Sequence, residues 1–199
     1  MGSRHMDKNE DGSGSEVQRN LVSRRSVYLF REDSVARSQL ETAFEAARQA
    51  PCHKHTHPWR FHVLGRETRQ ALVPEAERLT LEKDSSAGPD VLEKARNKIL
   101  SPPVLVAVSS LRSPGDSFRE EEDYAATVCA LHNLVLSLWD QGIGSQWSTG
   151  AITRSPAAYE VLGISKDEQR LIGFIKAGYP AEVPKTKKKS LAEIRSYLP

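Results

Sequence analysis

The stretch that decides the fold is residues 124–150, which read YAATVCALHNLVLSLWDQGIGSQWSTG. From Tyr124 to Gln141 the apolar residues recur at helical spacing and occupy most of the circumference. A helix that is apolar nearly all round is buried at the centre of a domain or lies at a subunit interface. Gly142 ends the predicted helix, and residues 145–149 are predicted to be extended.

Working outward, apolar periodicity predicts a mixed sheet flanked by helices. The second helix is predicted to begin with Ser38 as its cap and Glu41 completing a capping box. Ser155 is predicted to cap the last helix, with Pro156 at its first position. The predicted helices cover residues 17–23, 38–50, 66–83, 91–100, 124–141 and 155–162. The predicted strands cover residues 59–64, 104–108 and 171–177.

Length and composition set broad limits on the class of protein. The chain has 199 residues, of which 38% are hydrophobic and 27% charged, with a net charge of +2. We therefore expect one globular domain over residues 16–199, preceded by a polar tail or vector remnant at 1–15. The small net charge argues against nucleic acid, and no apolar run reaches the roughly 18–20 residues of a membrane span. With only two cysteines, a cytoplasmic location is expected.

Three polar motifs are candidates for binding. Arg24, Arg25 and Ser26 end the first predicted helix, and guanidinium groups with a hydroxyl suit a phosphate; a solvated arginine pair is the alternative. Residues 142–150 carry glycines that let the backbone approach a flat ligand; a simple helix C-cap is the alternative. The run at 185–189 suits a phosphate, an acidic partner or a nuclear address, or is a solvated tail.

Residues 50–61 read APCHKHTHPWRF and contain three histidines at alternating positions. On a strand, His53, His55 and His57 would share one face, as metal ligands do. Pro51 and Pro58 bracket the segment and favour a loop instead, with no carboxylate nearby in the sequence. We therefore predict no metal site. No nucleophile triad, carboxylate pair or P-loop is present, so an enzyme of this sequence would take its chemistry from a cofactor.

Taken in order, these motifs resemble the FMN-dependent nitroreductase superfamily, in its compact short-chain branch. The resemblance runs from Arg24 to about Leu191. Its motifs are RRS at 24–26, the loop and strand at 50–61, GIGSQWSTG at 142–150, and GFIKAGYP at 173–180 followed by a basic stretch and LAEI. The resemblance implies an α+β fold with a mixed, mainly antiparallel sheet flanked by helices, and an intertwined homodimer with FMN at the subunit interface.

The resemblance also implies roles for particular residues. The FMN phosphate and ribityl region would be bound by Arg24, Arg25, Ser26, Lys187 and Lys188. The flavin ring would be reached by Gln49 and His53 of the partner subunit and by Trp147, Ser148 and Thr149 of the same subunit. Four positions depart from the usual pattern: Tyr28 replaces a basic residue beside the flavin pyrimidine edge, and Cys52, His55 and His57 replace Ser, Asn and Gln.

The implied activity is FMN-dependent oxidation of NADH or NADPH, with ping-pong hydride transfer through flavin N5 to a nitroaromatic, quinone or similar small-molecule acceptor. No catalytic side chain is predicted, because the flavin carries the chemistry. Two alternatives stay open. One is an FMN-binding sensor or carrier without efficient turnover. The other is a flavin-free module that uses its lysine tail on nucleic acid or an acidic partner.

Overall fold

The computed structural model describes residues 15–199, so residues 1–14, most of the predicted tail, lie outside the described part of the chain. The helices are α1 (Glu16–Ser23), α2 (Arg37–Arg48), α3 (Arg66–Lys83), α4 (Pro89–Leu100), α5 (Ser117–Asp140) and α6 (Pro156–Leu162). The strands are β1 (Trp59–Val63), β2 (Val104–Leu111), β3 (Gly144–Ser148) and β4 (Gln169–Gly178). Short 3-10 helices are η1 (His53–His55), η2 (Ala151–Arg154) and η3 (Leu191–Glu193).

The four strands form one sheet in the order β1-β2-β4-β3, and every neighbouring pair is antiparallel. A single parallel bridge joins Ser26 to Ser145 at the outer side of β3. The expected α+β class with a mainly antiparallel sheet is confirmed, and the parallel component is confined to that bridge.

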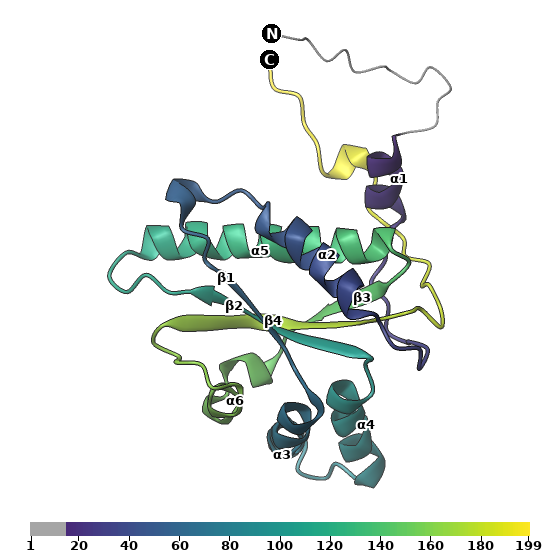
Figure 1. Ribbon diagram of the computed structural model, residues 1–199, viewed down its shortest axis with the longest axis vertical. Helices are drawn as coiled ribbons and strands as arrows, with labels where there is room; N and C mark the ends of the chain where they lie inside the picture. The colour runs from purple at the N-terminus through teal and green to yellow at the C-terminus, as the bar shows by residue number, and fades with distance from the viewer. Residues whose placement is uncertain (1–14) are drawn as a thin grey trace.

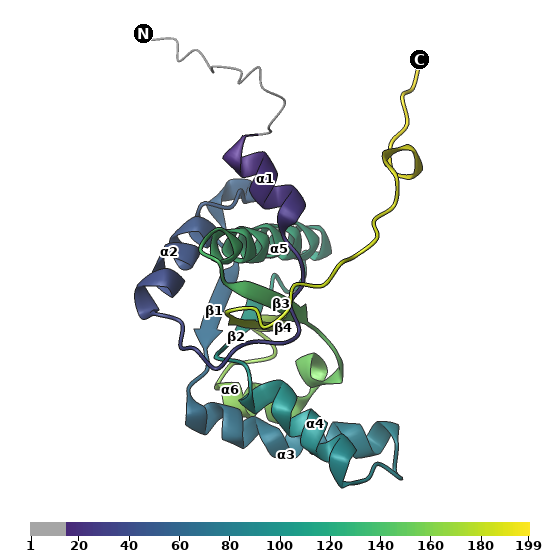
Figure 2. The same ribbon diagram turned by 90° about the vertical axis from the view of Figure 1, so that its right-hand side faces the viewer.

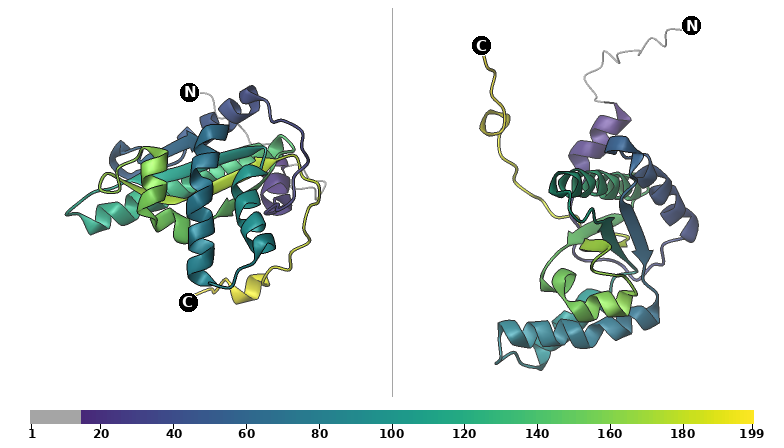
Figure 3. Two further views of the ribbon diagram at one scale, coloured as in Figure 1. Left: turned by 90° about the horizontal axis from the view of Figure 1, so that it is seen from below. Right: turned by 90° about the vertical axis from the view of Figure 1, so that its left-hand side faces the viewer.

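Helices cover both faces of the sheet, as Figure 1 shows. On one face, α2 and α5 pack on a core that includes Leu134, Val106 and Ile175. On the other face, α3, α4 and α6 pack on Leu105 and Phe174, and Figure 3 shows these three helices laid across the sheet from below. Successive side chains of a strand point to opposite faces, so on β4 Phe174 lies in the second core and Ile175 in the first.

Helix α5 is longer than predicted. It begins at Ser117, where the Asp116 carboxylate accepts a hydrogen bond of 3.0 Å from the Arg119 backbone N–H. Its first turns contain the acidic run 120–123, which lies outside the apolar pattern but is itself typical of a helix start, as the sequence indicates. Carboxylates near a helix N-terminus are stabilised by the helix dipole, which explains how this polar segment joins the helix.

The predicted capping box of α2 is wrong. The helix begins at Arg37, and the Gln39 side chain accepts a hydrogen bond of 3.1 Å from the Ala36 backbone N–H. Glu41 pairs with Arg37 at 3.4 Å instead of reaching back to the helix start. The reciprocal bond therefore comes from a glutamine two residues before Glu41, and the helix begins one residue earlier and ends two residues earlier than predicted. The predicted caps of α6 by Ser155 and Pro156 are confirmed.

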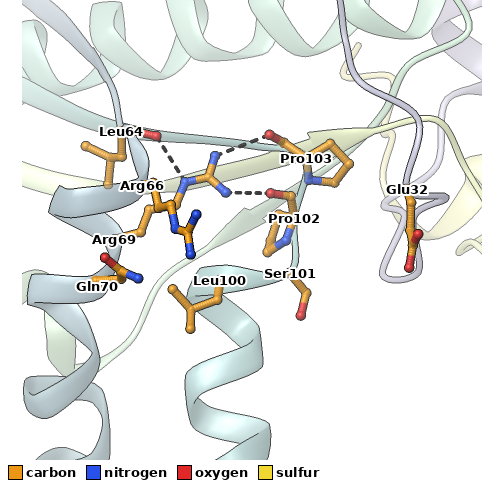
Figure 4. Close-up of a pocket in the computed structure, with 9 residues that line it drawn as sticks. All are labelled: Glu32, Leu64, Arg66, Arg69, Gln70, Leu100, Ser101, Pro102 and Pro103. Atoms are coloured by element: carbon orange, nitrogen blue, oxygen red, sulfur yellow. Dashed lines mark hydrogen bonds between the residues drawn. The ribbon is translucent and has the colours of Figure 1, made fainter.

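Arg69 fastens α3 to the connection between α4 and β2. Its guanidinium donates hydrogen bonds to the carbonyl oxygens of Leu64, Pro102 and Pro103, as Figure 4 shows. Burial lowers the pKa of Arg69, but carbonyl acceptors satisfy its donors. A pocket of about 610 Å³ surrounds Arg69. Because its donors are already bonded to the backbone, we assign Arg69 a structural role in joining α3 to the segment after α4.

Two glycines allow close approaches beside β3. A Cβ on Gly173 would lie 2.2 Å from Trp147 Nε1, and a Cβ on Gly144 would lie 2.6 Å from Val27 Cγ2. Any side chain at either position would force these neighbours apart. Both contacts fix β3, the edge strand that carries the predicted ligand-binding residues. In residues 15–199, no helix has the length and apolar character needed to cross a membrane.

Candidate functional site

A groove of about 1030 Å³ lies beside α3 and α4, on the sheet face opposite α5. We call it the α3–α4 groove. Its walls come from four parts of the chain: the segment 28–30, the facing sides of α3 and α4, the C-terminal part of β3 with the following turn, and β4. Phe174 and Leu105 form part of its apolar lining, and both belong to the second core. The groove thus combines a mostly apolar floor with polar ends, as ligand sites commonly do.

The turn after β3 supplies hydrogen-bond donors to this groove. Ser148, Thr149 and Gly150 line it. Gly150 has a φ of 144°, and the chain leaves the sheet here to enter η2. Within the described residues, the backbone N–H groups of Thr149 and Gly150 find no acceptor. Free backbone donors beside an apolar surface suit the polar edge of a flat ligand.

One buried cation also lines the groove. Lys176 on β4 is only 9% exposed, and it lies opposite Leu105 of β2 and Gln146 of β3. Burial lowers the pKa of Lys176, and the ammonium group of Lys98 lowers it further. No hydrogen bond or ion pair joins the side chain of Lys176 to another residue of the described chain. The sequence interpretation assigned no role to this residue.

The predicted phosphate ligands follow α1 directly. Arg24 is half-buried and lies near His132 of α5, whose pKa is lowered by burial and, to a smaller extent, by the Arg24 charge. Arg25 donates hydrogen bonds of 2.8 Å to the carbonyl oxygens of Val22 and Arg24. The Arg24 guanidinium has no partner within residues 15–199, so it is available to an anion.

Ser26 connects these arginines to the edge strand. Its bridge to Ser145, together with the 3.0 Å hydrogen bond from Val27 N–H to Ser145 O, fixes the segment beside β3. Tyr28, two residues beyond Ser26, is exposed and lines the α3–α4 groove. The RRS motif and the groove are therefore neighbours along one short segment.

Gln49 and His53 lie elsewhere in the same chain. The Gln49 amide donates to Glu45 at 2.9 Å, and His53 Nδ1 lies 2.7 Å from Glu122 Oε1 in the first half of α5. The α1 segment contacts the other half of α5, where the Asn20 amide donates to Leu136 O at 3.1 Å. Fourteen residues separate the two contacts, about 21 Å along a helix. Within one chain, His53 therefore lies apart from the segment that carries the RRS motif.

The remaining predicted ligands do not line the groove. Trp147 alternates with Ser148 on β3, donates from Nε1 to Ile172 O at 3.3 Å, and is 38% exposed. Lys187 and Lys188 are exposed in the segment after β4 and have no partner in the described residues. Figure 2 shows this C-terminal segment running away from the body of the molecule. The structure thus brings Ser148 and Thr149 to the groove and leaves the other three outside it.

The histidine loop is a turn rather than a strand. Lys54, His55 and His57 all have positive φ values between 44° and 53°, which breaks the alternation that a shared face would need. The Cys52 Sγ atom lies 3.7 Å from His57 Nδ1. Among residues 15–199 there is no cluster of three or more His, Cys, Asp or Glu side chains that could hold a metal ion.

A second buried polar network belongs to the framework. His62 Nε2 lies 3.3 Å from Ser109 Oγ, which donates to Gln169 Oε1 at 2.6 Å. Burial lowers the pKa of His62, and Ser109 is fully buried. With its hydroxyl hydrogen directed at Gln169 and no access to solvent, Ser109 is not placed as a nucleophile. The network ties β1, β2 and β4 together.

Comparison with known proteins indicates the family of the chain. The model of the nitroreductase family matches residues 21–179. "Putative NAD(P)H nitroreductase YfhC" of Bacillus subtilis (strain 168) is 30% identical over 176 residues, covering 87% of this chain and 90% of that protein. YdjA of Escherichia coli (strain K12), which carries the same name, is 28% identical over 162 residues, covering 80% of this chain and 86% of that protein.

Solved structures share the fold. A nitroreductase-like family protein from Bacillus cereus superposes with a TM-score of 0.80 and 27% identity, over 94% of this chain and 97% of that one. A Desulfovibrio desulfuricans protein solved in complex with FMN superposes with a TM-score of 0.76 and 19% identity, over 94% and 99% of the two chains. The predicted resemblance is confirmed: the chain belongs to the nitroreductase family.

Proposed function

We propose that the protein is an FMN-dependent NAD(P)H oxidoreductase. The observation that carries this proposal is the α3–α4 groove, which places free backbone donors of Thr149 and Gly150 beside an apolar floor in a chain of the nitroreductase family. The names of the relatives support NAD(P)H as the electron donor. The FMN complex of the Desulfovibrio desulfuricans protein shows that this fold holds that cofactor elsewhere.

The residues present fit FMN. A flat, largely apolar slot suits the isoalloxazine ring, and donors at its edge suit the ring's carbonyl oxygens and N5. The unpartnered guanidinium of Arg24, with Arg25 and Ser26, would hold the phosphate through charge-assisted hydrogen bonds. Lys187 and Lys188 would join the phosphate site, since neither has another partner in the described chain. Bound FMN would supply the hydride chemistry, accepting from NAD(P)H and donating to the second substrate.

The assembly that we propose is a homodimer. The His53 contact on α5 lies about 21 Å along the helix from the contact that α1 makes, and we propose that His53, with Gln49, meets the flavin of a neighbouring subunit. The C-terminal segment exposes four apolar side chains, with 65%, 66%, 82% and 86% exposure for Leu191, Ile194, Tyr197 and Leu198. Exposed apolar side chains on an extended arm favour burial against a second copy.

In this dimer each side chain has a limited task. The backbone donors of the turn after β3 orient the ring, and the apolar floor excludes water from one of its faces. His53, held by Glu122, approaches from the partner subunit and closes one side of the site. We propose a small nitroaromatic, quinone or similar acceptor, which would take the place left by oxidised NAD(P). No nucleophile is required, in agreement with the buried state of Ser109.

The setting that we propose is a single domain acting in the cytoplasm. All four strands join one sheet, which supports one domain over residues 16–199. Both cysteines, Cys52 and Cys129, are free thiols, which supports a reducing compartment.

Steady-state kinetics test this function against the FMN-binding alternative. A ping-pong oxidoreductase gives parallel double-reciprocal lines when NAD(P)H is varied at several fixed concentrations of 1,4-benzoquinone. A sensor or carrier gives bound FMN but no sustained turnover with either donor. Protein that binds FMN and fails to oxidise both NADH and NADPH would overturn the proposed function in favour of that alternative.

A further inference from the structure

Lys176 is a largely buried lysine that lines the α3–α4 groove and whose side chain has no partner among the described residues. Removing an ammonium group from water is costly unless a counter-charge or hydrogen bonds compensate for the loss. Lys176 is 9% exposed, so most of its side chain is buried, and only its ammonium end reaches the groove, where it has neither a counter-charge nor a hydrogen bond within the described residues. Neighbouring carboxylates do not supply one. Among residues 15–199, Asp84 at the C-terminal end of α3 is the only acidic residue that lines the groove, and no ion pair joins it to Lys176.

Most of the other ionisable groups around the groove are also positively charged, which disfavours the charged form of Lys176 further. From α3 and α4, Lys83, Lys94 and Lys98 add positive charge at the rim, and Tyr28 faces the groove from the opposite segment. The facing residues on the two neighbouring strands, Leu105 and Gln146, carry no charge. This surplus of cations around the ammonium group of a largely buried lysine suits an anionic ligand in the groove.

The position of Lys176 indicates which part of a flavin it would meet. Ser148 lies two residues beyond Gln146 on the same face of β3, about 7 Å along the strand, and the free donors of Thr149 and Gly150 follow at once. The floor at this point is apolar, which suits a ring better than a phosphate dianion. The phosphate ligands that we propose, Arg24 and Arg25, do not line the groove.

We propose that Lys176 is the cation that stabilises the negative charge acquired by the isoalloxazine ring when it is reduced. The proposal rests on the proposed function, since it requires FMN in the α3–α4 groove. It assigns the charge to a strand residue, in a chain that carries Tyr28 where the sequence resemblance implies a basic residue. Lys176 would act as a residue that tunes the flavin potential, because it would favour the reduced ring over the oxidised one.

The test compares Lys176→Met with the wild-type dimer. Lys176→Arg keeps the charge, and Lys94→Met removes an exposed lysine from the same rim. Binding of oxidised FMN is measured by fluorescence quenching. The two-electron potential is measured by anaerobic titration with dithionite and an indicator dye, which needs no turnover. We expect the affinity for reduced FMN, relative to oxidised FMN, to fall at least about tenfold in Lys176→Met, because an opposite charge within a few ångströms changes ionisation constants by that much.

A tenfold loss corresponds to a potential lower by about 30 mV for a two-electron couple. Lys176→Arg and Lys94→Met are expected to keep the wild-type potential, since the first retains the charge and the second removes a solvent-screened one. An unchanged potential in folded, FMN-loaded Lys176→Met would overturn the proposal. Equal weakening of oxidised and reduced FMN would also overturn it, because the lysine would then hold another part of the cofactor.

The outcomes separate this proposal from the proposed function. A wild-type protein that binds no FMN overturns both. A wild-type protein that binds FMN but is not reduced by NADH or NADPH overturns the proposed function alone, since dithionite still gives the potentials of both variants. If Lys176→Met does not fold, Lys176→Gln takes its place, with the same predicted loss.

Discussion

The tie between Glu75 and Ser155 holds two walls of the α3–α4 groove together, and its removal gives a measurable prediction. Glu75 lies on α3, is 6% exposed, and accepts two hydrogen bonds of 2.8 Å from Arg78. It also accepts a short hydrogen bond from the Ser155 hydroxyl, which caps α6. Ala151 and Ile152, just before this cap, line the groove.

The magnitude follows from which partners remain buried. In Glu75→Ala, Arg78 is 57% exposed and keeps its 3.2 Å contact with Glu82, so water solvates its charge at little cost. Ser155 is 4% exposed and loses its charged acceptor, which costs about 1.5–3 kcal/mol. Together with the vacated side-chain volume, we expect a loss of about 2–4 kcal/mol in the free energy of unfolding.

Urea unfolding followed by circular dichroism measures this loss as a lower midpoint at constant slope. The Arg78 hydrogen bonds, and to a lesser extent the Ser155 hydroxyl, lower the pKa of Glu75. A carboxylate whose pKa is lower in the folded state contributes stability above its unfolded pKa, and that contribution disappears as the pH falls through the folded pKa. Glu75→Gln should therefore lose most stability near neutral pH and approach the wild type in acid. A constant difference at every pH would refute this reasoning.

Three further predictions concern the flavin site. Arg24→Ala removes a charge-assisted contact worth about 1.5–3 kcal/mol and should weaken FMN binding by about tenfold or more; unchanged affinity in a fluorescence titration would reject the phosphate role. His53→Ala should damage the flavin site of the opposite subunit, so a mixed dimer in which only the mutant chain's own site is impaired would exclude the cross-subunit assignment. Gly173→Ala places a Cβ 2.2 Å from Trp147 Nε1 and should lower the free energy of unfolding by about 1–3 kcal/mol, with an altered tryptophan emission. Unchanged stability would show that β3 can shift to accommodate the methyl group.

Most of the framework was predictable because the apolar periodicity is strong. The predicted bounds of α3, residues 66–83, agree with the structure, and Pro74 is accommodated inside the helix without ending it. The errors occur where polar residues decide the outcome. The apolar pattern of α5 does not reach back to Ser117, although the acidic run 120–123 indicates a helix start, and the start of α2 depends on Gln39 instead of Ser38.

The site was less predictable than the fold. The sequence pointed to Ser148 and Thr149, which line the groove, and to Trp147, which does not. Alternation along β3 would have separated Trp147 from Ser148, had the strand been treated residue by residue. Lys176 was missed although a signal existed: a lysine stands inside the otherwise apolar run of β4, on the same face as Phe174.

The distance between the two groups of predicted ligands could not be obtained from sequence spacing. His53 is only 29 residues from Arg24 in the chain, yet His53 and α1 contact opposite halves of α5. Helix packing sets this separation, because α2 lies along α5 and carries its C-terminal end away from α1 (Figure 1). In the homodimer that we propose, His53 of one subunit would reach the flavin bound by the RRS motif of the other.

The most direct test of the central claim is an absorbance spectrum of the purified protein, recorded before and after anaerobic addition of NADH or NADPH. The account predicts the two visible bands of bound flavin, present on purification or after adding FMN and gel filtration, and their rapid bleaching by one of the two donors. Protein that remains colourless after incubation with FMN would contradict the account. It would direct attention to the lysine tail and the histidine loop instead.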